Sequence, residues 1–365
     1  MEIIALEEFR EARRGSRLPG PVIVRARAPL RLGLCGGGTD LPAYAERFGG
    51  AVLNATIDRY AFAFIRPRSD GLVAFRARDL GVEETHPARP AITGSRLALH
   101  HGVYDRMVRQ FNGGAPLPIT VTTSVDAPMG SGLGSSSALV VALIEAYRTY
   151  LNLPLGRYDV AHLAYEIERL DLALAGGKQD HYAAAFGGVN YIEFMAGDRV
   201  IVNPLRFADG TLNELETSLV ICFSGQSRAS DAIIGEQNAR LAARDPATLT
   251  AMHQLKDDAA DMKAAMLAGR ITEVAAVLNR SWLAKKRTAA GVSSGAIEAA
   301  VACGMANGAL ASKVSGAGGG GFVMFIVPPE ERFVLISALQ GAGAAAHPVK
   351  LSDKGSETWV LTETG

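Results

Sequence analysis

The sequence has little cysteine and no excess of charge of either sign. Only three of its 365 residues are cysteines, and Cys35, Cys222 and Cys303 lie far apart in the chain. An odd number at such spacing fits reduced, small apolar side chains and argues against a disulfide framework or a zinc knuckle. Basic and acidic residues balance at 37 each. That balance removes the argument for a general nucleic-acid or anionic-membrane binder.

The sequence also lacks a long apolar run. The first 15 residues, MEIIALEEFREARRG, interrupt their apolar positions with acids and bases, so they predict a surface helix and not a signal peptide. The late run Phe322–Val327 is far shorter than the roughly 20 residues that a membrane-spanning helix needs. These absences predict a cytoplasmic protein with no membrane partner.

A chain of 365 residues predicts two domains of ordinary size. The composition changes near residues 203–213, and we place the boundary there, between domains 1–207 and 208–365. Apolar periodicity predicts strands and helices in both halves, and therefore an α+β fold. The expected strands are 21–27, two runs within 51–65, 117–125, 188–193 and 219–223, and the expected helices are 97–111, 138–151, 160–174, 229–243, 247–268 and 271–287. The helix 160–174 is expected to bury Val160, Leu163, Ile167, Leu170 and Leu174, and to leave Glu168 and Asp171 together on another face.

A glycine- and serine-rich stretch, Asp126–Ala138 (DAPMGSGLGSSSA), joins an expected strand to an expected helix. Its three glycines let successive backbone N–H groups converge on one anion. The three serines open the helix, whose unpaired N–H groups and positive dipole end would face the same point. No lysine follows, so the stretch is not a Walker P-loop. The pattern indicates a polyphosphate site, and a serine-capped helix after a glycine turn is the alternative.

A second glycine-rich stretch, Gly316–Gly321, formally matches GxGxxG. The β-like run FVMFIVPP follows it, where a dinucleotide-binding fold requires a helix. We therefore expect a loop that lets a ligand or another loop approach closely, with a flexible turn as the alternative. Lys313 and Ser315 at its edge favour a nearby anion.

A third glycine-rich stretch is Pro29–Asp40 (PLRLGLCGGGTD). Its glycines clear space beside Thr39 and Asp40, a polar pair suited to hydrogen-bonding neighbouring hydroxyls of a sugar or polyol. Asp40 could instead cap the turn or the helix that follows. Arg31 could bind an anion or pair with an acid on the surface.

A carboxylate stands in the stretch Ala175–Gly188 (AGGKQDHYAAAFGG), where Asp180 follows two glycines. Asp180 and Glu168 could meet one phosphate site from different sides, one holding Mg²⁺ and one facing an acceptor hydroxyl. Taken alone, Asp180 fits a turn or a cap equally well. His181 is expected to be structural or at the edge of a substrate, because no second His or Cys lies at ligand spacing.

Taken in order, these stretches resemble the motifs of the GHMP kinases, the family of galacto-, homoserine, mevalonate and phosphomevalonate kinases. The three family motifs correspond to Pro29–Asp40, Pro128–Ala138 (PMGSGLGSSSA) and Lys313–Gly321 (KVSGAGGGG), and the likeness covers nearly the whole chain. The resemblance implies a two-domain α+β fold, with an N-terminal ribosomal S5 domain 2-like domain and a C-terminal ferredoxin-like domain. It also implies ATP as the phosphoryl donor and a small-molecule acceptor bound between the domains.

Within the family, RAPLRLGLCGGGTDLPAY and GGKQDHYAAAFGG look most like the D-glycero-D-manno-heptose 7-phosphate kinases. That likeness implies phosphorylation of the anomeric C1 hydroxyl to give the 1,7-bisphosphate, for GDP-heptose and surface-polysaccharide synthesis. The partners would be a sugar phosphate and ATP, without nucleic acid, and a homodimer is left open.

The resemblance also implies roles for particular residues. Asp180 would accept or orient the proton of the acceptor hydroxyl, and Arg31 would lie near the transferring phosphoryl group. Ser136 and Glu168 would ligate Mg²⁺. Lys178 departs from the broader family pattern, and we hypothesise that it stabilises the phosphoryl group or the 7-phosphate. The expected ATP contacts are Pro128, Gly130, Ser131, Gly132, Leu133, Gly134, Ser135, Ser136 and Ser137, and the expected sugar contacts are Gly37, Gly38, Thr39, Asp40, Gly318 and Gly319.

Three competing functions differ from this one. The first is a kinase of the same fold for another sugar, such as fucose or a mannose-like hexose. The second is a sensor that binds ATP and sugar without turnover, since a fold does not guarantee chemistry. The third is an NAD-binding enzyme, which rests on Gly316–Gly321 alone.

Overall fold

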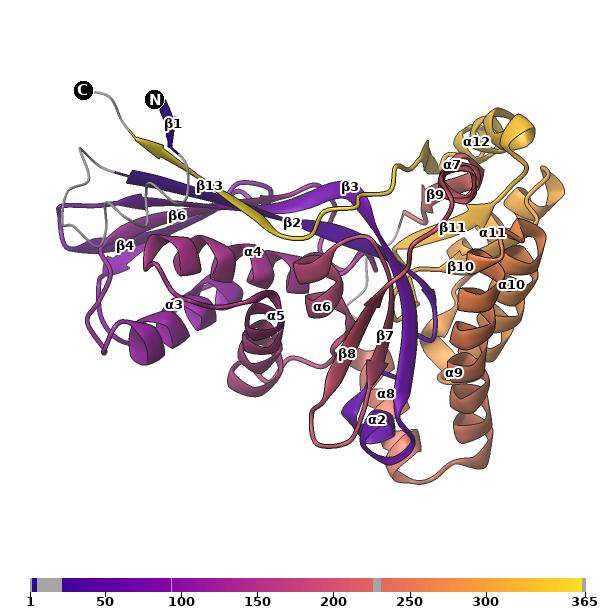
Figure 1. Ribbon diagram of the computed structural model, residues 1–365, viewed down its shortest axis with the longest axis horizontal. Coiled ribbons are helices and arrows are strands. Elements are labelled where there is room, and N and C mark those ends of the chain that lie inside the picture. The colour runs from indigo at the N-terminus through magenta and orange to yellow at the C-terminus, as the bar shows by residue number, and fades with distance from the viewer. Residues whose placement is uncertain (1, 5–21, 93, 226–230, 363–365) are drawn as a thin grey trace.

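The computed structural model describes residues 2–4, 22–92, 94–225 and 231–362, and within these ranges the strands form two sheets (Figure 1). The larger sheet has nine described strands in the order β1-β13-β2-β3-β6-β4-β5, with β7 paired to β3 and β8 to β7. Their bounds are β1 Glu2–Ile4, β2 Val22–Cys35, β3 Gly50–Pro67, β4 Leu72–Ala77, β5 Val82–Pro87, β6 Ile119–Val125, β7 Val189–Phe194, β8 Val200–Pro204 and β13 Glu357–Thr362.

Strand β2 runs further than its sequence pattern predicts, through the first half of the glycine-rich stretch Pro29–Asp40. Its first half alternates, with Arg25 and Arg27 partly exposed, whereas every residue from Ala28 to Cys35 is buried. Alternation marks the part with one open face, and the continuous apolar run marks the part covered on both faces. The two short runs expected within 51–65 likewise form one strand, β3.

Four helices cover one face of this sheet: α3 (Ala98–Phe111), α4 (Ser135–Tyr150), α5 (Arg157–Tyr165) and α6 (Gln179–Phe186), as Figure 1 shows. Helix α4 packs against β2 and β3 and is buried almost all round, which explains why its sequence is apolar on every side. The predicted helices 97–111 and 138–151 are confirmed, and the second begins three residues earlier, at Ser135.

The predicted helix 160–174 is helical as far as Asp171, but its second half is not an α-helix. Helix α5 passes into a π-helix over Glu166–Asp171, whose i→i+5 hydrogen bonds widen the turn and change which residues share a face. As a result Leu170, expected in the core, is 63% exposed, and Glu168 is buried. Glu168 and Asp171 therefore do not lie together. Asp171 instead accepts a hydrogen bond at its Oδ1 from Arg106 Nη2, at 2.6 Å.

The second domain is a four-stranded antiparallel sheet with helices. Its strands follow the order β10-β11-β9-β12, and the chain order strand, helices, two strands, helix, strand is that of a ferredoxin-like fold, as expected. The strands are β9 Leu219–Phe223, β10 Ala311–Val314, β11 Phe322–Ile326 and β12 Ala345–Pro348, and the helices of this half are α7 Asp209–Ser218, α8 Asp231–Ala242, α9 Pro246–Leu267, α10 Ile271–Lys286, α11 Gly295–Ala306 and α12 Arg332–Gly341. The predicted helices 229–243, 247–268 and 271–287 correspond to α8, α9 and α10.

After the second domain the chain returns to the first sheet. Strand β13 pairs with β2 on one side and with β1 on the other. Residues 2–4 are thus a strand where a helix was expected, and the rest of the predicted helix 1–15 lies outside the described residues. The division at 207/208 remains a prediction.

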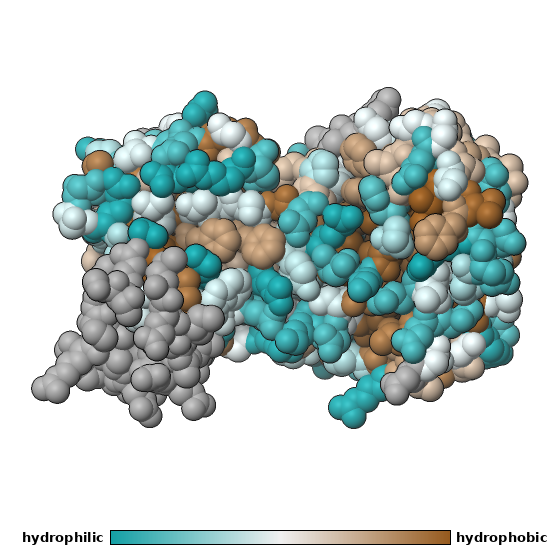
Figure 2. Space-filling model, turned by 90° about the horizontal axis from the view of Figure 1, so that it is seen from above, coloured by the Kyte–Doolittle hydropathy of each residue, from teal (hydrophilic) through white to brown (hydrophobic). Residues whose placement is uncertain are grey.

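The surface agrees with the balanced composition. Seen from above, hydrophilic residues are spread over both lobes of the molecule (Figure 2). No helix within the described ranges is long and apolar enough to cross a membrane. The three cysteines are free, as expected.

Candidate active site

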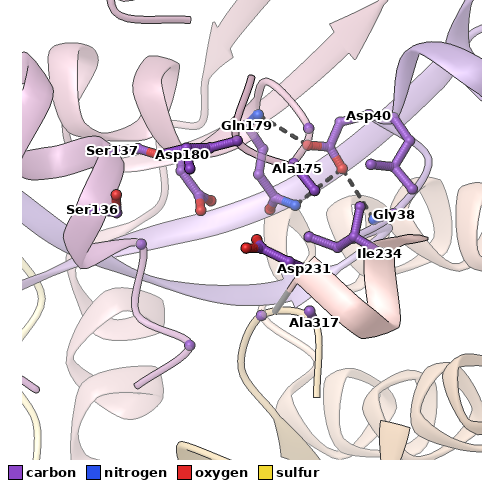
Figure 3. Close-up of a pocket in the computed structure, with 18 of the residues that line it drawn as sticks. Gly38, Asp40, Ser136, Ser137, Ala175, Gln179, Asp180, Asp231, Ile234 and Ala317 are labelled. Carbon is purple, nitrogen blue, oxygen red and sulfur yellow. Dashed lines mark hydrogen bonds between the residues drawn. The ribbon is translucent and has the colours of Figure 1, made fainter. Parts of the chain in front are cut away.

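A cavity of about 440 Å³ opens where segments from both domains meet. The end of β2, the glycine loop before α4, the start of α6, helix α8 and the end of α10 all contribute to its wall (Figure 3). These segments are far apart in the sequence, so only the fold brings them together. Three of the stretches singled out from the sequence, around residues 37–40, 129–137 and 175–180, therefore face one space.

The glycine loop before α4 has the shape expected of an anion cradle. Gly134 is the N-cap of α4 in the left-handed conformation, and no side chain caps the helix. The alternative of a serine-capped helix is therefore wrong, and the first N–H groups of α4 have no partner within the helix. Gly132 is needed for a close approach, because a Cβ there would lie 2.2 Å from the Ser315 carbonyl oxygen.

The loop around residues 315–321 braces the glycine loop. It connects β10 to β11, so the GxGxxG match opens no helix and the dinucleotide interpretation is wrong. The Ser315 hydroxyl donates to the Gly132 carbonyl at 2.9 Å, and Phe322 N–H donates to the Ser131 carbonyl at 2.9 Å. Gly316 and Ala317 line the cavity.

Some predicted contact residues lie behind the cavity wall. Gly318 and Gly319 pack against Val292, to whose carbonyl Gly319 N–H donates at 2.8 Å. These two glycines do not line the cavity, so a direct sugar contact is not supported for them. Pro128, Ser131 and Leu133 are also absent from its lining and shape the loop from behind, whereas the other predicted ATP contacts, Gly130, Gly132, Gly134, Ser135, Ser136 and Ser137, face the cavity.

Glu168 is the centre of a buried polar cluster. Its Oε1 accepts from the Ser136 hydroxyl at 2.5 Å, and its Oε2 accepts from the Ser137 hydroxyl and from His181 Nε2, both at 2.6 Å. Burial alone would raise the pKa of Glu168, but the His181 hydrogen bond and the nearby Arg169 charge hold it at about 2. Glu168 is thus an ionised carboxylate at neutral pH, and its partner Ser136 lines the same cavity.

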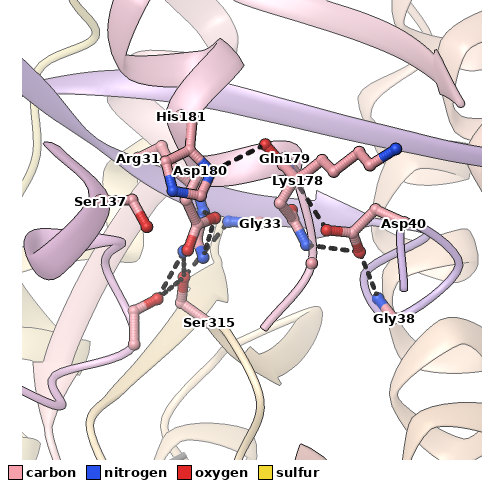
Figure 4. Close-up of polar contacts among 12 residues, drawn as sticks. Arg31, Gly33, Gly38, Asp40, Ser137, Lys178, Gln179, Asp180, His181 and Ser315 are labelled. Atoms are coloured by element: carbon pink, nitrogen blue, oxygen red, sulfur yellow. Dashed lines mark hydrogen bonds and ion pairs between the residues drawn. The ribbon is translucent and has the colours of Figure 1, made fainter. Parts of the chain in front are cut away.

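Asp180 lies in the first turn of α6, beside the glycine loop, where a Cβ on Gly134 would come within 3.4 Å of its Oδ2. Arg31 pairs with Asp180, with Nε 2.7 Å and Nη2 2.5 Å from Oδ1 (Figure 4). Nη1 of Arg31 donates to the Gly132 carbonyl at 2.5 Å. One arginine therefore joins the acidic residue of α6 to the glycine loop, and both charged groups line the cavity.

The polar pair Thr39 and Asp40 divides into two roles. The Thr39 side chain is fully buried and bonds backbone groups of Gly36 and Ala51, so its predicted sugar contact is not supported. Asp40 lines the cavity, as do Gly37 and Gly38. Its Oδ1 accepts from Gly38 N–H at 3.0 Å, and its Oδ2 accepts from the N–H of Gln179 at 3.0 Å.

Lys178 does not face the cavity. Its ammonium pairs with Asp198 and lies 5.0 Å from the centre of the Tyr165 ring. Figure 4 shows the side chain extending away from Asp180 and Arg31. The structure therefore does not support the prediction that Lys178 stabilises the transferred group or the distal phosphate.

Sequence reasoning missed several polar residues of the cavity wall, namely Gln179, Arg169, Lys285, Asp231 and Gln237. Gln179 donates from Nε2 to Asp40 Oδ1 at 3.1 Å, and its Oε1 is buried without a hydrogen-bond partner among the described residues. Arg169 bonds carbonyl oxygens of the loop before α6, including that of Ala175 at 3.2 Å. In the sequence, Gln179 and Arg169 stand next to the predicted carboxylates Asp180 and Glu168, and this adjacency could have indicated them. No feature of the sequence indicated Lys285.

The comparisons with known proteins agree with this fold. The models described as GHMP kinases N terminal domain and GHMP kinases C terminal match residues 98–188 and 262–345. The D-glycero-alpha-D-manno-heptose 7-phosphate kinase of Campylobacter jejuni is 40% identical over 337 residues, which cover 92% of this chain and 98% of the relative. The chain therefore belongs to the GHMP kinases.

It is a sugar kinase, a phosphotransferase with an alcohol group as acceptor, and ATP is the donor that this family uses. The crystal structure of a D-glycero-D-manno-heptose 1-phosphate kinase from Bacteroides thetaiotaomicron superposes with a TM-score of 0.79 at 39% identity, covering 92% of this chain and 98% of that one. The L-fucokinase/L-fucose-1-P guanylyltransferase of Bacteroides fragilis is 25% identical over 91% of this chain and 38% of its own length. The alternative of a sensor without turnover is set aside.

Proposed function

We propose that this kinase transfers the γ-phosphoryl group of ATP to the anomeric C1 hydroxyl of D-glycero-D-manno-heptose 7-phosphate. The observation that carries the proposal is the meeting of Asp180 with the uncapped start of α4 in one cavity. A carboxylate that can accept the proton of a hydroxyl then stands beside a site that can hold the phosphoryl donor. The heptose is proposed from the 40% identical relative and from its near-complete overlap with this chain.

The chain's own groups divide the work. The N–H groups at the start of α4 bind donor phosphate oxygens, and the fixed charge of Arg31 stabilises charge that develops on the transferred group. Asp180, held by Arg31, orients the acceptor hydroxyl and accepts its proton. Positioning and charge neutralisation supply most of the rate in such transfers, so Asp180 need not be a strong base.

The residues near the donor phosphates also fit Mg²⁺. Ser136 and Glu168 present a hydroxyl and an ionised carboxylate oxygen 2.5 Å apart at the cavity wall. Mg²⁺ prefers such oxygen ligands and usually takes one or two from the protein, the rest coming from phosphates and water. Among the described residues there is no group of three or more His, Cys, Asp or Glu that could hold a metal. When bound, Mg²⁺ would neutralise phosphate charge.

The position of the new phosphate is the point to test. The curated relative is named for a heptose 7-phosphate and the solved structure for a heptose 1-phosphate, and phosphorylation of either would give the same 1,7-bisphosphate. Each sugar phosphate should be offered separately with ATP, and the product followed by ³¹P NMR. We expect turnover of the 7-phosphate with a new signal coupled to the anomeric proton. Turnover of the 1-phosphate instead would reject the proposed acceptor.

A panel that includes fucose and mannose addresses the other acceptors, since a fucokinase is among the relatives. Preference for either unphosphorylated hexose would replace the heptose 7-phosphate. We place the reaction in the cytoplasm, where ATP and sugar phosphates are available, with the product entering GDP-heptose and surface-polysaccharide synthesis.

A further inference from the structure

The cavity wall carries three described cationic side chains, and one of them has no acidic partner. Arg31 is paired with Asp180. Arg169 Nη2 lies 3.4 Å from Glu168 Oε2, and the same guanidinium donates to carbonyl oxygens of the loop before α6. Lys285 lines the same cavity, yet no carboxylate among the described residues lies within ion-pair distance of its ammonium. Lys285 is therefore the cation left for a ligand.

The surroundings of Lys285 are fixed by its place in the last turn of α10, and the residue is 3% exposed. Its Nζ donates to the Gly37 carbonyl at 2.9 Å, and it lies so near Gly38 that a Cβ there would come within 3.2 Å. An ammonium has three N–H donors, so two remain for other acceptors. Burial lowers the pKa of Lys285 to about 8, against the raising effect of Asp40. A buried cation without a counter-ion is costly and is typical of functional sites.

Contacts along the wall place Lys285 at the acceptor end. Asp180 lies against the glycine loop, and its neighbour Gln179 hydrogen-bonds Asp40 at 3.0 and 3.1 Å. Asp40 in turn bonds Gly38, which adjoins Lys285. The order from the donor end is thus glycine loop, Asp180, Asp40, Lys285. A sugar whose reacting hydroxyl meets Asp180 would extend its remaining carbons toward Lys285.

We propose that Lys285 binds the phosphate that the acceptor sugar already carries. The inference rests on the proposed function, because it requires an acceptor with a phosphate of its own. It assigns to Lys285 the role that sequence reasoning gave to Lys178. The phosphoryl group in transfer is a second phosphate that an ammonium in this cavity can bind, so the experiment separates the two sources of phosphate.

The test compares Lys285→Met with Lys286→Met. Lys286 is the next residue of the same helical turn, and its ammonium pairs with Glu298 at 3.4 Å, so it is a matched control. Each protein is assayed with heptose 7-phosphate and with the same heptose lacking the phosphate, and acceptor affinity is measured by calorimetry without nucleotide. In Lys285→Met we expect a 10- to 100-fold loss of affinity and of kcat/KM for the phosphorylated acceptor, about what a lost charge-assisted hydrogen bond produces. The unphosphorylated heptose, the KM for ATP and Lys286→Met should change by less than about 3-fold.

Several outcomes would overturn the inference. If Lys285→Met leaves the ratio of kcat/KM for the two acceptors unchanged, Lys285 does not bind the phosphate of the sugar. An equal loss with both acceptors, together with a raised KM for ATP, would assign Lys285 to the transferred group, and an equal loss with a lowered unfolding temperature would make it structural. If the wild-type enzyme shows no preference for the phosphorylated sugar, the proposed acceptor is rejected. That result comes from the wild-type assay alone and does not depend on the Lys285 variant.

Discussion

Replacing Lys285 by methionine should stabilise the ligand-free protein at pH 7. Burial lowers the pKa of Lys285 from 10.5 to about 8, and each pKa unit corresponds to 1.36 kcal/mol, so the charged side chain costs the fold about 3 kcal/mol. Methionine has a similar reach without charge, but it leaves the Gly37 carbonyl without its 2.9 Å partner, which costs about 1 kcal/mol. The net expected gain is about 2 kcal/mol.

The gain should disappear at high pH. The folded pKa lies below the unfolded one, so between about pH 8 and 10.5 the unfolded chain holds more protons and wild-type stability rises with pH. The cost of the charge is complete below pH 8 and is nearly gone at pH 10, where the variant should have no advantage. Asp40, Arg31 and Lys313 act electrostatically on this group or feel its charge. All three stay in the variant, and removal of the Lys285 charge also relieves one cause that lowers the pKa of Lys313, which adds to the gain at pH 7.

Urea unfolding of the ligand-free proteins at pH 7 and pH 10 measures both values, with Lys286→Met as the control. The control should differ from wild type by less than about 1 kcal/mol at either pH, as expected for a half-exposed ion pair. A Lys285→Met protein that is less stable than wild type at pH 7 would refute the reasoning. So would a gain of the same size at both pH values.

Three further predictions concern turnover and ligand binding. Asp180→Asn should keep ADP binding but lose about 100-fold or more in kcat, and near-normal turnover would remove Asp180 from the mechanism. Ser136→Ala should raise the KM for Mg·ATP by a larger factor than it changes the Kd for the sugar, because the Ser136 hydroxyl lies with Glu168 at the donor end. Separate titrations in which sugar binding weakens more than Mg·ATP use would reject the metal assignment. Gln179→Ala should weaken acceptor binding about 10-fold, since Gln179 lines the cavity beside Asp180 and its buried Oε1 has no partner among the described residues. ADP affinity should stay the same, and a loss confined to ADP would contradict that role.

The parts of the site that could be predicted from sequence are those set by local backbone chemistry. Gly132 and Gly134 hold positive φ, a conformation that a side chain disfavours, so the glycine spacing itself reports the shape of the loop. Helix α4 follows from its apolar content. Glu168 and Asp180 could be singled out through the family resemblance, because Asp180 taken alone fits a turn or a cap equally well.

The parts that could not be predicted depend on where the chain goes in three dimensions. Lys178 adjoins Asp180 in sequence, but the side chain turns to Asp198, whereas Lys285 arrives from a helix more than a hundred residues later. The π-helix at Glu166–Asp171 breaks the 3.6-residue period on which the exposure of Leu170 was judged. Thr39 has the residue type of a sugar ligand, yet tertiary contacts with Ala51 use its hydroxyl. Periodicity and residue type carry no information about such partners.

The pairing of β13 with β2 has a consequence for synthesis of the chain. Glu357–Thr362 supplies the neighbour of Val22–Arg27, so the first sheet is incomplete until about 360 residues have been made. While the ribosome produces the second domain, the β2 edge has unpaired N–H and C=O groups that can pair with another chain. The first domain to be translated is thus the last to finish folding, and an early stop before Glu357 should yield a chain prone to aggregate even though every residue lining the cavity is present.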